Sequence, residues 1–136
     1  MKGKHLIEEG VRLLGNVELG EGVAIGAPAE LNARDSQITI GDGCDIASYV
    51  TITTADSHGK CIGIAEHITR EPVMLGEHVF VGQGAIILGG TRIGHHSVIG
   101  AGVVLHGQTI PPHSRVKAAP PIIEAGHYAP RNQPCG

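Results

Sequence analysis

The chain has 136 residues, of which 41% are hydrophobic, 2% are aromatic and 21 are glycine, and its formal net charge at pH 7 is −3. This length suits one domain with one core, and the scattered lysines and arginines form no basic stripe of the kind that binds nucleic acid. No apolar run approaches the roughly 20 residues of a membrane span, and residues 1–10 lack the apolar core of a signal peptide, so we expect a cytoplasmic protein without nucleic-acid or membrane partners.

Aliphatic residues recur at every sixth position in the N-terminal part of the chain, at Leu13, Leu19, Ile25 and Leu31. A small or branched residue lies two positions before each of them, and glycine often follows. A step of six would drift around a helix of about 3.6 residues per turn, whereas residues two apart share one face of a strand. The period predicts a solenoid of short parallel strands, in which three hexapeptides form one triangular coil of about 18 residues.

The repeat is first interrupted at residues 32–37, where its register slips by three residues. The same spacing then resumes at Ile40, Ile46 and Ile52. Because the interruption is short and polar, it predicts a bulge at one corner of the solenoid.

The three cysteines are Cys44, Cys61 and Cys135. They fit a reducing compartment, in which cysteines are more often buried or idle than bridged. Cys44 occupies an inward position of the repeat, so we expect it in the core.

A longer interruption, at about residues 54–72, reads TADSHGKCIGIAEHITREP. It predicts a protruding loop, and loops held on a rigid scaffold often carry catalytic side chains. His58 lies near the start of this loop. An imidazole with a pKa of about 6.5 can accept a proton from a hydroxyl or amino group near neutral pH. Asp56 could orient that imidazole, hold a substrate hydroxyl, or bond only to its own backbone.

The hexapeptide spacing continues after the loop, at Leu75, Val81, Ile87, Ile93, Ile99 and Leu105. With the first stretch, it predicts about five coils between residues 11 and 118. Residues 119–136 are rich in proline, which predicts an extended tail that caps the last coil or packs on a neighbour. We expect residues 1–136 to form a single domain.

Two segments of this chain carry a family resemblance. ITIGDGCDIASYVTITTADSHG and, after the loop, PVMLGEHVFVGQGAIILGGTRIGHHSVIGAGVVL resemble the hexapeptide-repeat acetyltransferases that modify sugars, a group with maltose, galactoside and nodulation acetyltransferases. The family pattern is a strand that ends in D-x-H or T-H, a protruding loop, and then P-V-x-I-G. Here it matches Asp56-Ser57-His58 and the residues from Pro72 to Ile87. The resemblance covers roughly residues 17–118.

The resemblance implies an all-β fold, a left-handed parallel β-helix, although parallel crossovers in general are right-handed. It also implies transfer of an acetyl group from acetyl-CoA to a hydroxyl or amino group of a sugar, nucleotide sugar or polysaccharide precursor. His58 would be the general base and Asp56 would bind the substrate.

The family binds its co-substrate in a groove between the subunits of a trimer, so the resemblance implies a homotrimer. Gly84 and Ala85 match the stretch that approaches the pantetheine arm, and Ala101 matches the small residue one coil further on. Lys117 falls near the basic positions that face the CoA phosphates. No metal ion is expected.

Other functions remain open. γ-Class carbonic anhydrases share the fold and hold zinc with three histidines, two of them five residues apart, but the nine histidines here contain no such pair. His95 and His96 are adjacent and would point to opposite faces of a strand. A zinc site made by His58, Cys61 and His67 is still possible, as are Cys61 as an acylated nucleophile and a non-catalytic scaffold.

Overall fold

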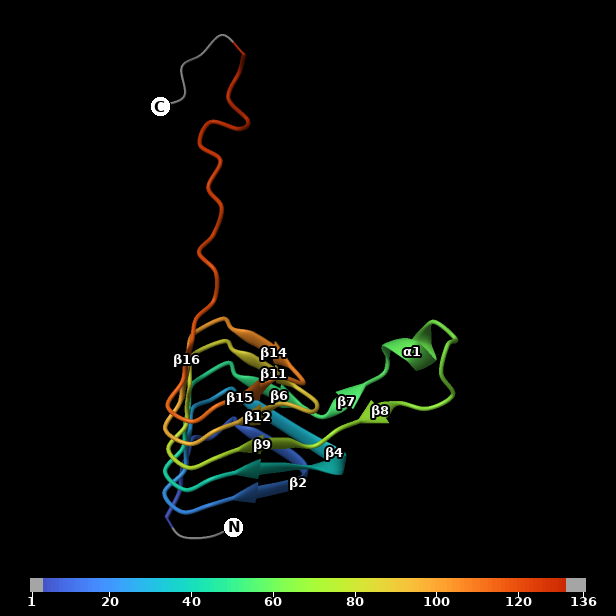
Figure 1. The fold of residues 1–136 in the computed structure, drawn as a ribbon, viewed down its shortest axis with the longest axis vertical. Coiled ribbons are helices and arrows are strands. Elements are labelled where there is room, and N and C mark those ends of the chain that lie inside the picture. The colour runs from blue at the N-terminus through green and yellow to red at the C-terminus, as the bar shows by residue number, and fades with distance from the viewer. Residues whose placement is uncertain (1–3, 132–136) are drawn as a thin grey trace.

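The structure, a computed structural model that describes residues 4–131, is a stack of short parallel strands with little helix (Figure 1). Its elements in chain order are β1 (Leu6–Ile7), β2 (Arg12–Leu19), β3 (Ala24–Ile25), β4 (Glu30–Ile40), β5 (Asp45–Ile46), β6 (Thr51–Thr53), β7 (Ala55–Asp56), α1 (His58–Cys61), β8 (Thr69–Arg70), β9 (Val73–Leu75), β10 (Phe80–Val81), β11 (Ile86–Leu88), β12 (Arg92–Ile93), β13 (Val98–Ile99), β14 (Val104–His106), β15 (Thr109–Ile110) and β16 (Arg115–Val116). The fold is therefore all-β and solenoidal, as the hexapeptide period predicts.

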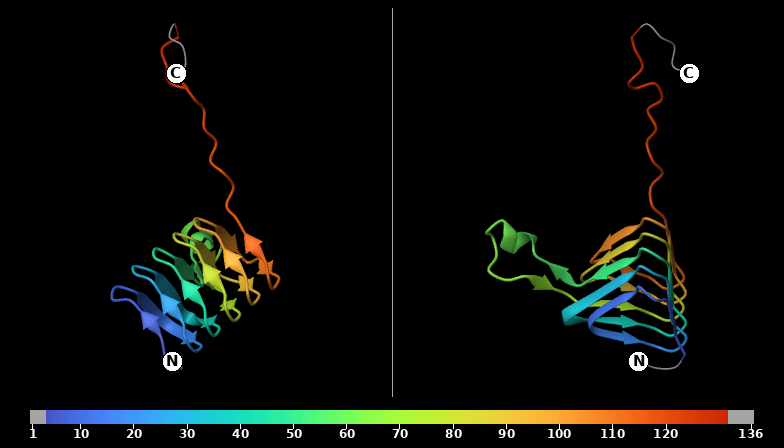
Figure 2. Two further views of the ribbon diagram at one scale, coloured as in Figure 1. Left: turned by 90° about the vertical axis from the view of Figure 1, so that its left-hand side faces the viewer. Right: turned by 180° about the vertical axis from the view of Figure 1, so that it is seen from behind.

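The strands form three faces of a triangular prism (Figure 2). One face is a sheet in the order β1-β3-β5-β10-β13-β16. The other two faces meet at β2 and β4, because the first half of β4 pairs with β6 and its second half pairs with β9. Six strands stack on the first face, one more turn than the five expected from residue 11 onward. The additional turn is supplied by β1, whose Ile7 lies six residues before Leu13 and continues the same register.

The two interruptions can be read from the pairing register. On the first face, Leu6 lies beside Ala24, 18 residues further on, and the same step separates Phe80 from Val98. The step is 21 residues from Ala24 to Asp45, which spans the slip, and 35 residues from Asp45 to Phe80, which spans the loop. The strands of the stack therefore stay in register, because each insertion projects from the prism at a corner.

The slip at residues 32–37 lies inside the long strand β4. The pairing of β2 with β4 shifts between Gly15 and Val17, as in a β-bulge. Asp35 has a φ of +52°, and Gly15 has a φ of +74° at a point where a Cβ atom would overlap the backbone of Ala33. These left-handed residues turn the chain around the predicted corner.

The aliphatic positions of the repeat fill the interior of the prism. The largest fully buried side chains are Ile25, Leu31, Ile38, Ile40, Ile46, Ile52, Leu75, Ile87 and Ile99. Burial of each such side chain contributes about 1.5–3 kcal/mol to folding. Cys44 is buried as expected, with its Sγ 3.1 Å from the Gly76 carbonyl oxygen, and burial raises the pKa of this thiol. The core is thus a continuous aliphatic column that makes the prism rigid.

The loop and the tail leave the prism in different directions (Figure 1). The loop is closed at its base by antiparallel pairing of β7 with β8, and α1 begins directly beyond β7. The described part of the tail, residues 119–131, extends away from the last turn and does not cap it (Figures 1 and 2). Cys135 lies outside the described residues. Among residues 4–131, no helix is long and apolar enough to cross a membrane.

Candidate functional site

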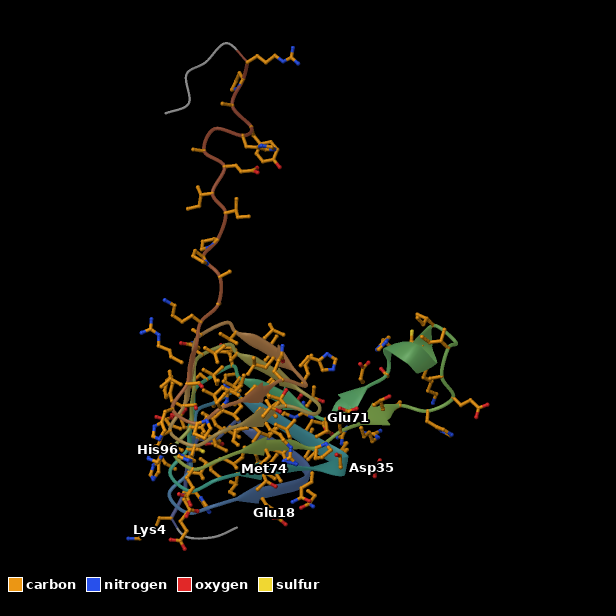
Figure 3. All side chains as sticks on the ribbon, viewed as in Figure 1. Lys4, Glu18, Asp35, Glu71, Met74 and His96 are labelled. Carbon is orange, nitrogen blue, oxygen red and sulfur yellow. The ribbon has the colours of Figure 1, made fainter. Side chains whose placement is uncertain are left out.

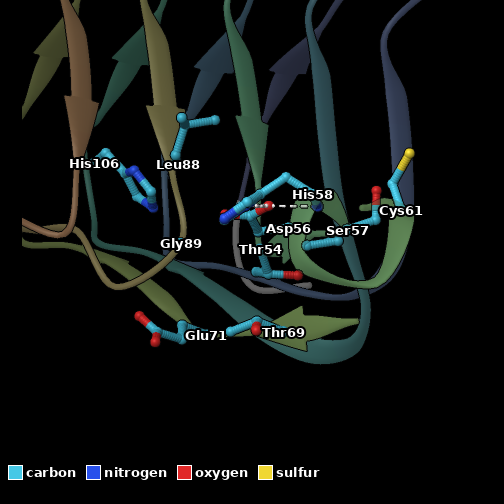
Figure 4. Close-up of a pocket in the computed structure, with 11 residues that line it drawn as sticks. Thr54, Asp56, Ser57, His58, Cys61, Thr69, Glu71, Leu88, Gly89 and His106 are labelled. Carbon is cyan, nitrogen blue, oxygen red and sulfur yellow. Dashed lines mark hydrogen bonds and ion pairs between the residues drawn. The ribbon is translucent and has the colours of Figure 1, made fainter. Parts of the chain in front are cut away.

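A pocket of about 860 Å³ lies where the base of the loop meets the face formed by β6, β11 and β14 (Figure 4). It is lined by Thr54, Ala55, Asp56, Ser57, His58, Cys61, Thr69, Glu71, Leu88, Gly89 and His106. Three loop residues with candidate roles, Asp56, His58 and Cys61, are among them, whereas His67 is not. The loop insertion therefore makes a pocket together with a rigid wall of the prism.

The base of the loop is fixed to the corner bulge in β4. Arg70, at the end of β8, donates a hydrogen bond of 3.0 Å from Nη1 to the backbone oxygen of Arg34. Its Nη2 lies 3.9 Å from Oδ2 of Asp35. The two interruptions of the repeat thus contact each other, and the bulge holds the loop that carries His58.

His58 is oriented by Asp56, two residues earlier in the chain. The Oδ1 atom of Asp56 accepts a hydrogen bond of 3.0 Å from the backbone N–H of His58 and lies 2.5 Å from the ring Nδ1 (Figure 4). A carboxylate can only accept hydrogen bonds, so the proton of the neutral ring lies on Nδ1 and the lone pair lies on Nε2. This tautomer is the one that a general base requires.

The same contacts keep Asp56 ionised. The hydrogen bond from the His58 backbone, followed by that from the His58 ring, lowers the pKa of the Asp56 carboxyl. The His58 side chain is 72% exposed and that of Asp56 is 34% exposed. The imidazole is therefore held at one nitrogen while the rest of the ring is open to a ligand.

Two further polar side chains in the pocket, His106 and Glu71, were missed by sequence reasoning. His106 follows Leu88 by one coil of 18 residues and pairs with it in the sheet, so the repeat length could have placed it here. Glu71 lies at the returning end of the loop, where its backbone N–H donates a 3.0 Å bond to the carbonyl of Thr54. Only the closure of the loop brings Glu71 to the pocket, and no short sequence pattern signals it.

Three of the four predicted CoA-binding residues gather at another corner of the prism. Gly84 and Ala101 lie on successive turns, since Gly102 N–H bonds to the carbonyl of Gln83 at 3.1 Å. Lys117 directly follows β16, which pairs with β13 just ahead of Ala101. A Cβ atom at Gly84 would meet nothing within 4 Å, so this corner is open.

Ala85, the fourth residue, faces inward. Its side chain is fully buried in the core. Its backbone N–H donates to Gly82 at 3.1 Å, and its C=O accepts from Thr51 at 3.0 Å. Ala85 therefore lines the core directly beneath the open corner at Gly84.

The structure also bears on the predicted metal ligands. Within residues 4–131, no three His, Cys, Asp or Glu side chains are arranged to hold a metal ion, so His58, Cys61 and His67 do not form such a group. The prediction that His95 and His96 point to opposite faces is wrong, because their Nδ1 atoms lie 3.0 Å apart. These residues lie in a corner, where His96 has a φ of +55°, and not in a strand.

Comparison with known proteins agrees with the repeat and the fold. Residues 72–107 match the family model described as bacterial transferase hexapeptide (six repeats). Over 82 residues, the chain is 37% identical to nodulation protein L of Rhizobium meliloti (strain 1021), an alignment that covers 54% of this chain and 43% of that protein. The chain thus spans less than half of this curated relative.

Solved structures give the same result for the fold. A maltose O-acetyltransferase from Clostridium difficile 630 superimposes with a TM-score of 0.70 at 31% identity, over 84% of this chain and 62% of that one. AntD, an N-acyltransferase from Bacillus cereus in complex with dTDP and 3-hydroxybutyryl-CoA, also has a TM-score of 0.70, at 22% identity, over 81% of this chain and 62% of that one. The chain therefore carries the hexapeptide repeats of bacterial transferases, and hexapeptide-repeat acetyltransferases are among the proteins that it resembles in sequence and in fold.

Proposed function

We propose that this protein transfers an acetyl group from acetyl-CoA to a hydroxyl or amino group of a sugar, nucleotide sugar or polysaccharide precursor. The observation that carries the proposal is the contact of 2.5 Å between Nδ1 of His58 and Oδ1 of Asp56 at the edge of a pocket of about 860 Å³. A histidine held by a carboxylate and open at its second nitrogen is the arrangement that general-base catalysis needs. The maltose O-acetyltransferase supports the choice of reaction.

In the proposed reaction, His58 moves one proton. Bound acetyl-CoA supplies the acetyl group as a thioester. Nε2 of His58 accepts the proton of the acceptor hydroxyl or amine while the acceptor oxygen or nitrogen attacks the thioester carbon. When the carbon–sulfur bond breaks, the proton passes from Nε2 to the sulfur, which leaves as the free thiol. The ionised Asp56 stabilises the imidazolium between these two steps.

The face between the pocket and the open corner suits an elongated donor. The six residues from Gly84 to Gly89, which include β11, span at most about 16 Å, because their five steps rise by about 3.3 Å each when extended. The outward side chains of Ile86 and Val104 on this face are apolar and exposed. We propose that the pantetheine arm lies along them, with Gly84 and Ala101 at the open corner and Lys117 near the phosphates. Ala85 is buried beneath that corner and supports it without touching the donor.

The acceptor is proposed to bind in the pocket beside the loop. Asp56 uses Oδ1 for His58, which leaves Oδ2 to accept a hydrogen bond from a sugar hydroxyl. Glu71 supplies a second carboxylate on the opposite side of the pocket (Figure 4). Hydroxyl and amino groups are the donors that two carboxylates would select.

We propose a cytoplasmic homotrimer in which a second subunit completes the donor groove. The exposed Ile86 and Val104 support this assembly, since a single chain leaves the proposed donor face open on one side. Light scattering on the purified protein should give three times the mass of one chain. A monomer that retains full activity would contradict the shared groove.

The proposed reaction is tested by following free thiol released from acetyl-CoA with a panel of sugars, amino sugars and nucleotide sugars. His58→Ala should lower the rate by about 10²–10⁴-fold, the usual contribution of a general base. His67→Ala is the matched control, because His67 is exposed in the same loop but does not line the pocket. Acceptor-dependent thiol release that survives in His58→Ala would refute the role of His58, and no release with any acceptor would favour a scaffold.

A further inference from the structure

A second group of histidines lies on an edge of the prism away from the loop. We name it the histidine corner: His78, His95, His96 and His113. Figure 3 shows His96 on this edge, with Glu71 on the opposite side at the base of the loop. All four side chains are exposed. The histidine corner is thus separate from the pocket that contains His58.

The turns of the solenoid bring these histidines together. His78, His96 and His113 have φ values of +52°, +55° and +60°. They occupy equivalent positions on successive turns, because His96 N–H bonds to Glu77 O at 2.9 Å and His113 N–H bonds to His95 O at 3.0 Å. Histidine is among the residues that tolerate this left-handed conformation. One corner position, repeated along the stack, therefore builds a column of imidazoles.

The rings are in mutual contact. The ring centroids of His95 and His96 are 5.2 Å apart, and those of His95 and His113 are 5.1 Å apart. His96 lies 5.0 Å from His78 and 5.4 Å from His113. The shortest polar contact is the 3.0 Å between the Nδ1 atoms of His95 and His96. In the neutral pair, one Nδ1 donates its proton to the lone pair of the other, so an ion that replaces this proton would contact both nitrogens.

We propose that the histidine corner binds a divalent transition-metal ion, with His95 and His96 as a chelating pair. A metal–nitrogen bond of about 2.0–2.1 Å and a nitrogen separation of 3.0 Å give an angle of about 91–97° at the ion. This is close to the right angle between neighbouring ligands of a square-planar or octahedral ion. A tetrahedral zinc ion with the same bond lengths would need its two nitrogen ligands to lie about 3.3–3.4 Å apart. The spacing therefore favours ions such as nickel(II) and copper(II).

The pair is the preformed part of the site. Within the part of the chain that the structure describes, no three donor atoms converge on one point. The rings of His78 and His113 flank His96 and are exposed, so rotation about their side-chain torsions can supply a third nitrogen, and water can fill the other positions. Asp42 and Glu77 precede Gly43 and His78 on this corner, and their negative charges favour a bound cation.

Nickel(II) is the probe of choice, because copper(II) can oxidise the exposed thiol of Cys61. Calorimetric titration at pH 7.5 should show one tight site in the natural protein. His95→Asn and His96→Asn should each weaken binding at least about tenfold through loss of one chelating nitrogen. Asparagine is used because it also tolerates a positive φ, so the fold is kept. Nickel should also raise the melting temperature of the natural protein more than that of either variant.

His127→Asn is the matched control, because His127 is an exposed histidine in the tail with an acidic neighbour, Glu124, at 3.2 Å. It should bind nickel as the natural protein does. Binding should weaken from pH 7.5 to about pH 5.5, since protons compete for the imidazole nitrogens. If His95→Asn and His96→Asn bind nickel as tightly as the natural protein, the contact of 3.0 Å is only a hydrogen bond and the proposed site does not exist.

Discussion

Two corners of the same prism carry exposed histidines, but the neighbours of those histidines differ. At the loop corner, His58 contacts a carboxylate, which fixes the proton on Nδ1 and leaves Nε2 as a base. At the histidine corner, the nearest neighbour of His96 is another imidazole. The comparison teaches that the partner of a histidine, more than its exposure, decides whether the ring is suited to move a proton or to bind a metal ion.

Among the variants that test this difference between the two corners, the largest effect on activity is expected when the charge of Asp56 is removed. Asp56→Asn keeps a hydrogen-bond acceptor beside Nδ1 but loses the charge that stabilises the imidazolium. We expect kcat for acetyl transfer to fall about 100-fold, with little change in KM for acetyl-CoA and no change in nickel binding. Steady-state kinetics and calorimetry on one preparation check both parts, and an unchanged kcat would show that Asp56 does not position the base.

Glu71 tests whether the pocket binds the acceptor. Glu71→Gln should raise KM for the acceptor about tenfold through loss of a charge-assisted hydrogen bond, while kcat stays within about threefold. Steady-state kinetics with a varied acceptor separates these quantities. Glu66→Gln, in the same loop but outside the pocket, serves as the control. An equal change in both variants would mean that only the net charge of the loop matters.

Gly43 tests how the backbone builds the histidine corner. Gly43 has a φ of +68°, and a Cβ atom there would overlap the ring of His78. A Cβ atom at a left-handed residue costs about 1–2 kcal/mol. Gly43→Ala should lower the free energy of unfolding by this amount and by the further cost of displacing the His78 ring, and so by more than Gly22→Ala. Gly22→Ala is the matched control, because Gly22 has a φ of +64° but a Cβ atom there would meet nothing within 4 Å. Urea denaturation measures the free energy of unfolding of both variants. If both lose the same stability, the loss comes from the backbone conformation alone and not from the contact with His78.

The smallest effect concerns acid stability. The pKa of Asp56 is lowered on folding, so its contribution to stability is present above the unfolded pKa of about 3.9 and is lost as the pH falls through the lower, folded pKa. Melting curves of the natural protein and Asp56→Asn should therefore differ most near neutral pH, begin to converge at about pH 4 and coincide only below the folded pKa. A difference that persists unchanged into acid would contradict this linkage.

Much of the fold can be predicted from the sequence, because the hexapeptide period is a local signal. The aliphatic residues that it selects, such as Leu31, Ile52 and Ile87, are buried, and the two breaks in the period become the bulge and the loop. The inward direction of Ala85 also follows from the period, since it lies two residues before Ile87. The period also extends to β1, because Ile7 lies six residues before Leu13, but β1 was not among the coils expected from residue 11 onward.

The candidate site is harder to predict, because it depends on contacts between turns. His58 can be found from the loop, but His106 needs the register of β11 and β14. Glu71 needs the closure of a loop whose geometry the sequence does not specify. Strand geometry predicts opposite directions for His95 and His96, whereas the positive φ of His96 at a corner brings their rings together. The hexapeptide period thus predicts which residues form strands, but it does not predict the backbone conformation at the corners.

The role of His58 as the general base is tested most directly by the rate of acceptor-dependent acetyl transfer by His58→Gln at saturating acetyl-CoA. Glutamine keeps a polar side chain of similar length but cannot act as a base at neutral pH. We expect kcat to fall by about 10²–10⁴-fold, with acetyl-CoA still bound and the fold intact by circular dichroism. A kcat within about threefold of the natural protein would contradict the assignment of His58 as the base.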